Sequence, residues 1–206
     1  MEIMNQLENL KKIAKTKLAK NDPAHDFEHV MRVYRNAEKI CKTESGNKKL
    51  ILSAVLLHDI IKTKNRKDSS LKSAKLSEKI LKENNFHDDE IKIISNAIKQ
   101  HSFSKGKIPS TIEGKILQDS DRLDAIGAIG LARVFSFSGS NNRPFYDPND
   151  PFSKNRVLND NRWALDHFYE KLLTLEKKMN TKTGKILAKK RTKILKNFLK
   201  ELKTEI

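Results

Sequence analysis

The sequence predicts an all-α fold, and three observations support this. Apolar residues recur every three or four positions along most of the chain, which is the helical period. Glycine and proline, which interrupt helices, number only 7 and 5 among 206 residues. No segment shows the apolar–polar alternation of a half-buried strand. With neither an internal repeat nor a low-complexity linker, we expect one domain over 1–206, its core about 22–135 and C-terminal helices about 161–205 packed on it.

The helices expected in the first half share this apolar spacing. They cover about 3–13, 27–40, 50–61, 71–81 and 88–101. Asp26 and Asp88 are of a type that caps helix N-termini, so we expect each to begin a helix. The segment 50–61 is apolar on nearly every side, which predicts a central, buried helix.

The second half is expected to contain three helices and a long loop. The helices cover about 111–135, with a bend near Gly127 and Gly130, then 161–179 and 183–205. Between them, Ser138–Asp160 concentrates Gly, Pro, Asn and Asp, which predicts a loop. Long loops in compact domains are often functional, so this one is a candidate to close over a substrate.

The chain is strongly basic, with 42 Lys and Arg against 26 Asp and Glu and a formal net charge of +16. An anionic partner is one interpretation. We favour a lysine-rich composition of solvated helix faces, because the lysines are spread along the chain. The densest block, Lys185 to Lys203, alternates with apolar residues as a core-facing helix would. A nucleic-acid partner stays open, although no binding motif accompanies the charge.

Other features bound the location of the protein. Cys41 is the single cysteine, so no intrachain disulfide can form, and we interpret it as a small core residue. No long uncharged apolar run exists, so we expect no membrane span. The N-terminus lacks the apolar core of a signal peptide, which makes a cytoplasmic location the default expectation.

The pair His58-Asp59 is the first candidate for chemistry. It directly follows the apolar run Ala54 to Leu57 at the end of the expected buried helix. Burying both polar groups is costly unless they are satisfied. A divalent metal ion satisfies an imidazole nitrogen and a carboxylate oxygen together, whereas a hydrogen bond within the core is the alternative.

A second cluster of acids follows in Gln-Asp-Ser-Asp-Arg-Leu-Asp, residues 118–124. Asp121 lies four residues after Leu117, so it should face inward and can be a ligand. Asp119 and Asp124 are expected to orient ligands or hold Arg122. His29 lies on an early helix face, and His101 lies on an isoleucine stripe beside a helix end.

Taken in order, these segments resemble the HD superfamily of metal-dependent phosphohydrolases. The shared pattern is an early helical His (His29), a His-Asp pair on a buried helix (His58-Asp59) and a later Asp (Asp121). The closer similarity is to the YpgQ/YedJ branch. It rests on 25–29, 101–104, 119–130, 167–172 and 179–181 and spans roughly residue 22 to the C-terminus.

The resemblance implies an HD-domain helical bundle in which His29, His58, Asp59 and Asp121 bind a divalent ion. Mn²⁺ is the expected ion, with Mg²⁺, Co²⁺, Ni²⁺ and Fe²⁺ as alternatives. The implied reaction is hydrolysis of nucleoside triphosphates to monophosphate and pyrophosphate, with Asp59 orienting the attacking water.

Residues around the metal receive further roles. Those expected to neutralise phosphate charge are Lys62, Lys64, His101 and Arg122. Those expected to bind substrate are His25, Arg32, Lys64, His101, Arg133 and Arg143. Asp26, Asp119 and Asp124 are expected to orient the ligands.

The chain departs from the branch at Lys62, where the branch usually has an acidic residue. Because that acid helps to position the attacking water, the departure weakens the case for the reaction more than the case for the metal site. Phosphomonoester or cyclic-nucleotide hydrolysis at the same site stays an alternative. So does a non-catalytic nucleotide- or nucleic-acid-binding protein with a structural metal. Homodimerisation also stays open.

Overall fold

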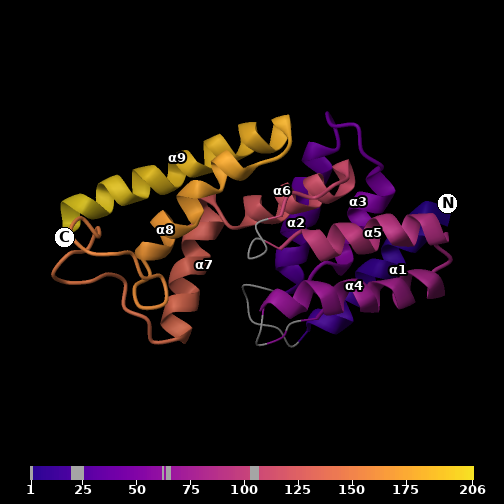
Figure 1. Cartoon of the computed structure of the whole chain (residues 1–206), viewed down its shortest axis with the longest axis horizontal. Helices are drawn as coiled ribbons and strands as arrows, with labels where there is room; N and C mark the ends of the chain where they lie inside the picture. The colour runs from indigo at the N-terminus through magenta and orange to yellow at the C-terminus, as the bar shows by residue number, and fades with distance from the viewer. Residues whose placement is uncertain (1, 20–25, 62, 64–65, 103–106) are drawn as a thin grey trace. The chain divides into compact units, whose positions relative to one another are not determined.

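The computed structural model describes residues 2–19, 26–61, 63, 66–102 and 107–206, the side chains of 2–4 and 66–67 excepted. Every regular element in these ranges is helical, and none of them contains a strand (Figure 1). The predicted all-α fold is therefore confirmed. None of the helices in the described ranges combines the length and apolar character needed to cross a bilayer.

The described residues form two compact units, Met1–Asp121 and Arg122–Ile206. The boundary falls inside helix α6 (Ile112–Asp124), which contributes to both units. The first unit contains five further helices: α1 (Glu2–Leu18), α2 (Phe27–Ile40), α3 (Lys48–Leu57), α4 (Arg66–Glu83) and α5 (Asp88–Gln100).

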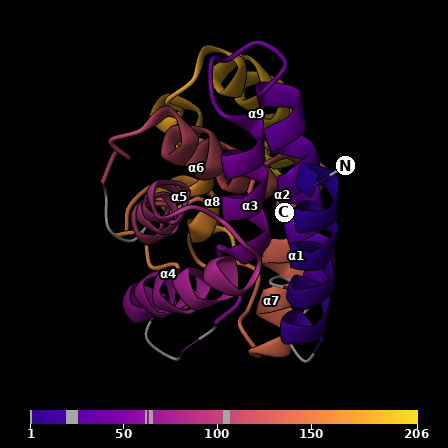
Figure 2. The ribbon, with the colours of Figure 1, turned by 90° about the vertical axis from the view of Figure 1, so that its right-hand side faces the viewer.

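Helix α3 is the centre of the first unit. Its residues from Leu50 to Leu57 are all buried, because the segment is apolar on every side. Helices α1, α2 and α5 pack directly against it, and α4 packs on α5 (Figure 2). The predicted central helix is thus observed, but α3 ends at Leu57, earlier than the expected Ile61, and His58 is its C-cap.

Helix termini show one confirmed cap and one correction. Asp26 is the N-cap of α2, and its carboxylate accepts a hydrogen bond of 2.8 Å from the backbone N–H of His29. Helix α5 begins one residue earlier than a cap at Asp88 requires, because its N-cap is His87. The Glu90 carboxylate accepts from the backbone N–H of His87 at 3.1 Å, which satisfies one of the donors exposed at this terminus.

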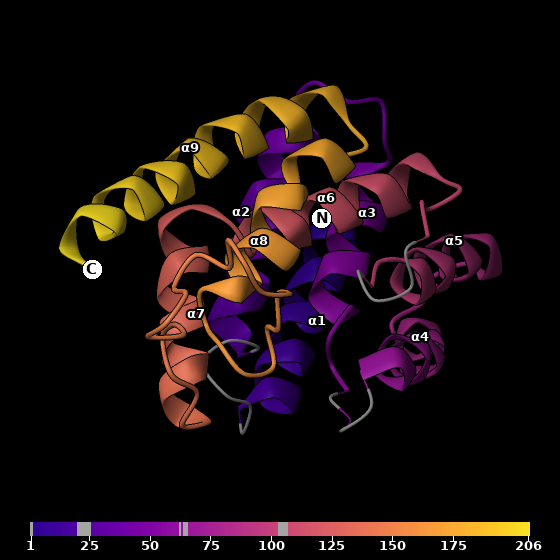
Figure 3. The ribbon, with the colours of Figure 1, turned by 60° about the vertical axis from the view of Figure 1, so that its left-hand side comes forward.

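The second unit contains α7 (Gly127–Ser140), α8 (Asp166–Glu170) and α9 (Lys182–Glu205). Two 3-10 turns, η2 (Leu172–Thr174) and η3 (Glu176–Lys178), lie between α8 and α9. Helix α9 packs against α7 and both turns, and Figure 3 shows it running past them along one side of the unit. The rings of Phe135, Phe168 and Phe198 contact one another at this junction, with centroids 5.7–6.0 Å apart.

The predictions for the second half need two corrections. The expected helix 111–135 is interrupted where the bend near Gly127 was expected, but the interruption is complete: the chain turns at Ala125-Ile126 and resumes as a second helix at Gly127 with φ +80°. The expected helix 161–179 is only the short α8 and the two 3-10 turns. The expected last helix, 183–205, is confirmed as α9.

The predicted loop 138–160 is also shifted, because α7 continues to Ser140 and non-helical chain extends to Leu165. The loop is tied within its own unit. Arg156 donates to both carboxylate oxygens of the buried Asp166, at 2.6 and 2.8 Å. The guanidinium of Arg143 donates to the Ser138 hydroxyl and to the Asp160 carbonyl. Closure of this loop over a substrate stays a prediction.

Candidate metal centre

Four helices of the first unit bring their polar ends to one place. Helix α2 carries His29 in its first turn, and α6 carries Asp121 near its C-terminus. Helix α3 ends directly before His58 and Asp59, and His101 is the C-cap of α5. Residues far apart in sequence therefore meet at or near helix ends, where their side chains point toward one another.

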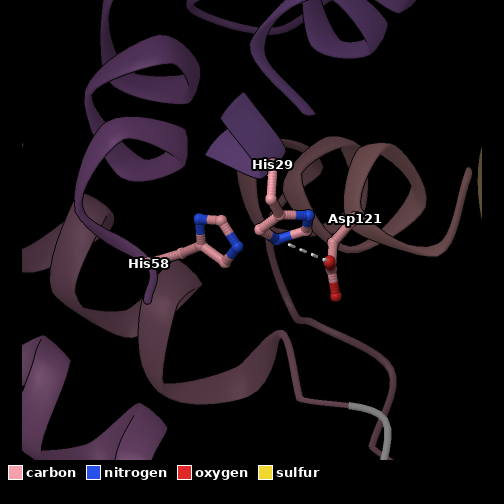
Figure 4. A group of neighbouring side chains, drawn as sticks. All are labelled: His29, His58 and Asp121. Atoms are coloured by element: carbon pink, nitrogen blue, oxygen red, sulfur yellow. Dashed lines mark ion pairs between the residues drawn. The ribbon is translucent and has the colours of Figure 1, made fainter. Parts of the chain in front are cut away.

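The side chains converge at distances suited to a shared ion. His29 Nε2 lies 3.6 Å from Asp121 Oδ1 and 3.9 Å from Asp59 Oδ2. His58 Nε2 lies 3.7 Å from the same Asp59 oxygen. Figure 4 shows the His29 ring directed toward Asp121, with the His58 ring on its other side.

Two overlapping groups in the described ranges meet the geometric requirement for a metal site. One consists of His29, His58 and Asp121, and the other of His58, Asp59 and His101. Within each group the ligand atoms all lie within 4.8 Å of one another. Because the groups share His58 and lie side by side, they form one cluster of three imidazoles and two carboxylates.

The hydrogen bonding of His58 provides a test of whether a cation fits. Its Nδ1 lies 2.7 Å from the Val55 carbonyl oxygen, which can only accept, so Nδ1 carries the proton. In the neutral ring Nε2 then presents a lone pair. This nitrogen is buried and has no hydrogen-bond partner in the described part of the chain. A buried polar atom of this kind is costly, and a cation is the group that would satisfy it.

Burial divides the cluster into a closed and an open side. The histidine side chains are nearly inaccessible, with exposed fractions of 1% for His29, 0% for His58 and 5% for His101. The carboxylates of Asp59 and Asp121 are 26% and 29% exposed. Water or a phosphate group can therefore approach from the carboxylate side.

Electrostatics within the cluster favour the protonation states that bind metals. Burial lowers the pKa of His58 and so favours the neutral ring, an effect that Asp59 opposes only in part. Burial acts to raise the pKa of Asp59, but the adjacent imidazole of His58 and the hydrogen bond with His101 outweigh it, and the pKa lies well below its usual range. The pKa of Asp121 is lowered in the same way, burial being outweighed chiefly by His29.

His101 lies on the other side of Asp59 from His29. Its Nδ1 lies 2.6 Å from the Ile98 carbonyl oxygen, the same backbone arrangement that His58 makes with Val55. Its Nε2 therefore faces Asp59 Oδ1, at 3.6 Å. The two oxygens of Asp59 thus point to different partners, Oδ2 to His29 and His58 and Oδ1 to His101.

Two buried amides hold the helices of the site in register. The Asn36 amide on α2 donates to the Ser120 carbonyl on α6 at 3.1 Å, next to Asp121. The Gln118 amide on α6 donates to the His101 carbonyl at 3.2 Å. Sequence reasoning did not single out either residue. The available signal was spacing, since Asn36 lies two helical turns after His29 and Gln118 one turn before Asp121.

Other predicted site residues make contacts within the second unit. Arg122 donates to the Lys178 carbonyl, and Arg133 pairs with Asp124 at 2.6 Å. Arg143 belongs to the loop network described above. Their predicted roles toward a substrate are therefore not supported by contacts with the cluster, and they stay predictions.

The remaining predicted residues lie either in the first unit or outside the described ranges. Asp26 caps α2 at His29, Asp119 is fully buried on α6, and Arg32 is half-buried on α2. His25, Lys62 and Lys64 lie outside the described residues.

Comparison with known proteins identifies the family of this chain. Residues 26–126, which contain all five side chains, match the HD domain family. The YpgQ protein of Bacillus subtilis is 32% identical over 211 residues, a match that covers the whole chain and 96% of YpgQ. The chain belongs to the HD superfamily.

Solved HD structures share the fold over nearly the whole chain. A crystal structure of Bacillus subtilis YpgQ in complex with ADP superimposes with a TM-score of 0.81 at 30% identity, covering 100% of this chain and 97% of that one. An HD-superfamily hydrolase from Bacillus thuringiensis gives a TM-score of 0.78 at 32% identity, with 98% and 97% covered. HD membership supports a metal-dependent phosphohydrolase, and the donor set of nitrogen and oxygen atoms is consistent with a divalent ion.

Proposed function

We propose that this HD protein hydrolyses nucleoside triphosphates to nucleoside monophosphate and pyrophosphate with a divalent ion, Mn²⁺ first among candidates. The observation that carries the proposal is the cluster itself, in which a buried, unpartnered His58 Nε2 faces the carboxylate of Asp59. The nucleotide is supported by the similarity to YpgQ, which was solved in complex with ADP.

The proposed ligands are His29, His58, Asp59 and Asp121. When bound, the ion would supply a more acidic water and a polarised phosphoryl group. The chain contributes the rigidity of the site. The two carbonyls behind His58 and His101 fix the orientation of both rings, and Asn36 holds α6 against α2 beside Asp121.

Asp59 has a second proposed task. Its Oδ2 belongs to the metal side of the cluster, whereas its Oδ1 faces His101. A carboxylate fixed in this way can accept a hydrogen bond from the attacking water and hold it in line with the phosphorus atom. His101, in its protonated form, is the proposed donor to a phosphate oxygen. Burial acts to lower the pKa of His101, but the hydrogen bond and charge of Asp59 outweigh it and raise the pKa, which favours this form.

The test is product analysis by phosphorus NMR after incubation of purified protein with Mn²⁺ and a panel of nucleoside triphosphates. We expect pyrophosphate and nucleoside monophosphate from the wild type. Asp59→Asn removes a charged ligand and should lower turnover at least about 100-fold, since even residues behind the ligands contribute 10–100-fold. The matched control is Asp89→Asn, which removes an exposed carboxylate on α5 and should retain wild-type turnover.

The products separate the alternatives. Orthophosphate without pyrophosphate would indicate a phosphomonoesterase-like reaction and would replace the proposed cleavage. If nucleoside triphosphates are inert and a cyclic nucleotide is opened, the enzyme is a phosphodiesterase. Turnover in Asp59→Asn equal to wild type would remove the metal mechanism altogether.

A further inference from the structure

A row of lysines runs along α9 in the second unit. Its members share one face of the helix and are all exposed: Lys182, Lys185, Lys189, Lys193, Lys196, Lys200 and Lys203. At 3.6 residues per turn these seven positions fall within an arc of about 80°, and at 1.5 Å per residue they extend over about 32 Å. We call this row the lysine stripe.

The stripe is not balanced by acids. The helix has only two, Glu201 and Glu205, both at its C-terminal end and off the arc of the stripe. Within the described part of the chain, none of the seven ammonium groups forms an ion pair. Solvated helix faces usually mix both signs because Glu–Lys pairs stabilise a helix and like charges destabilise it. A row of seven like charges is therefore unfavourable for the helix by itself.

The buried face of α9, which lies about 100° around the helix axis from the stripe, explains how the helix tolerates this charge. Ala188, Leu195 and Leu199 are buried, and α9 packs on α7 and on the turns η2 and η3 (Figure 3). Packing of the apolar face thus fixes the helix and leaves the stripe exposed along its flank. Apolar residues that recur with helical spacing between Lys185 and Lys203 lie on the buried face, and the lysines of the stripe lie on the flank beside it.

We propose that the lysine stripe binds the phosphate backbone of double-stranded nucleic acid without reading its sequence. A duplex has one phosphate per about 1.7 Å of axis when both strands are counted, so a row of about 32 Å comes within reach of phosphates of both strands. Lysines suit this task as flexible point charges that contact phosphates, whereas base recognition requires side chains fitted to base edges.

Two observations favour a duplex over other polyanions. The aromatic ring of α9, Phe198, stacks on Phe168 inside the unit, so the helix offers no stacking platform for the bases of a single strand. A membrane-surface helix needs an apolar face to insert, and the apolar face of α9 is occupied by its own unit. Among the apolar residues of α9, only Ile186 and Ile194 are exposed, and of these only Ile186 lies next to the stripe.

The test is fluorescence anisotropy with two labelled duplexes of unrelated sequence, each of about 20 base pairs and so longer than the stripe. EDTA in the buffer keeps the metal centre out of the measurement. We expect equal affinity for both duplexes and a slope of log K against log salt of about −6 if all seven lysines meet phosphates. Changing Lys185, Lys189, Lys193 and Lys196 to Gln should bring the slope to about −3.

The control variant changes the same number of charges elsewhere. Lys72, Lys75, Lys79 and Lys92 are exposed on α4 and α5, and their replacement by Gln should leave the slope near the wild-type value. Circular dichroism verifies that both variants are folded. Equal losses in the two variants would mean that only net charge matters, and this would overturn the proposal.

Binding to a single strand and to lipid vesicles distinguishes the duplex from other polyanions. Absence of duplex binding at about 50 mM salt overturns the proposal, as does tighter binding of a single strand than of a duplex. Vesicles of phosphatidylcholine with and without phosphatidylserine are tested in parallel. Binding to the anionic vesicles without duplex binding would assign the stripe to a membrane surface instead. None of these results affects the proposed hydrolysis, which is measured separately.

Discussion

At the scale of single residues, the site depends on which ring nitrogen each histidine presents. Val55 and Ile98 contribute backbone carbonyls that bind Nδ1 of His58 and His101, so that Nε2 of both rings points into the cluster. Backbone groups therefore select the nitrogen that would bind an ion or a substrate. A sequence pattern shows the histidines but not these carbonyls, which is why it could not distinguish ligands from other polar residues of the site.

The residue-scale prediction separates His29 from His101. His29→Ala removes a proposed ligand and should weaken Mn²⁺ binding at least about 100-fold, more than loss of a residue behind the ligands would. His101→Ala removes a proposed phosphate donor, and turnover should fall by about 100–1,000-fold with Mn²⁺ affinity nearly unchanged. Isothermal titration calorimetry with Mn²⁺ measures the affinities, and phosphorus NMR measures turnover.

The two variants control for each other because each removes one nearly buried imidazole from the same cluster. If His101→Ala loses Mn²⁺ as severely as His29→Ala, then His101 is a ligand, as membership of the group His58, Asp59 and His101 permits. If neither variant changes Mn²⁺ affinity, the proposed ligand set is wrong.

At the scale of elements, the apolar period predicts where helices run better than where they stop. The boundaries of α2 and α9 follow the expectation closely, whereas the helix expected over 111–135 is divided. The interruption depends on backbone geometry that spacing does not record. Gly127 has φ +80°, and a side chain on Gly130 would lie 2.2 Å from the Ala125 carbonyl oxygen.

The element-scale prediction concerns the glycines of α7. Gly127→Ala should lower the free energy of unfolding by about 1–2 kcal/mol because φ is positive there. Gly130→Ala should lower it by about 1–3 kcal/mol because the chain at Ala125 must shift to admit the new methyl group. Gly139→Ala, on the same helix with nothing within 4 Å of the new methyl group, should be stabilising by about 0.5–1 kcal/mol.

Urea unfolding followed by fluorescence measures these effects. Trp163 is the single tryptophan and lies in the same unit as α7, so its emission reports on the relevant structure. A Gly130→Ala variant as stable as wild type would show that the backbone at Ala125 can shift to admit the methyl group without strain. That result would contradict the explanation given for the division of the predicted helix.

At the scale of the whole molecule, the sequence predicted the all-α fold class and singled out the residues that lie together at the metal centre. It did so because buried polar residues in apolar surroundings carry information that survives without coordinates, as with His58-Asp59 after Leu57. It could not predict the irregular chain between α7 and α9. There the structure depends on long-range pairs such as Arg156 with Asp166, which no periodicity encodes.

The whole-molecule prediction concerns metal and stability. An ion that binds only the folded chain stabilises it by about 2.7 kcal/mol at a concentration 100 times its Kd. Differential scanning calorimetry should therefore show a rise in Tm on addition of Mn²⁺, reversed by EDTA. Because His29, His58, Asp59 and Asp121 all belong to the first unit, hydrogen exchange should slow in α2, in α6 and at the end of α3.

The Asp59→Asn variant should lose both the rise in Tm and the slower exchange, whereas Asp89→Asn should keep them. An equal rise in Tm for Asp59→Asn would mean that Mn²⁺ stabilises the chain elsewhere, since this carboxylate lies within 4 Å of both His29 and His58.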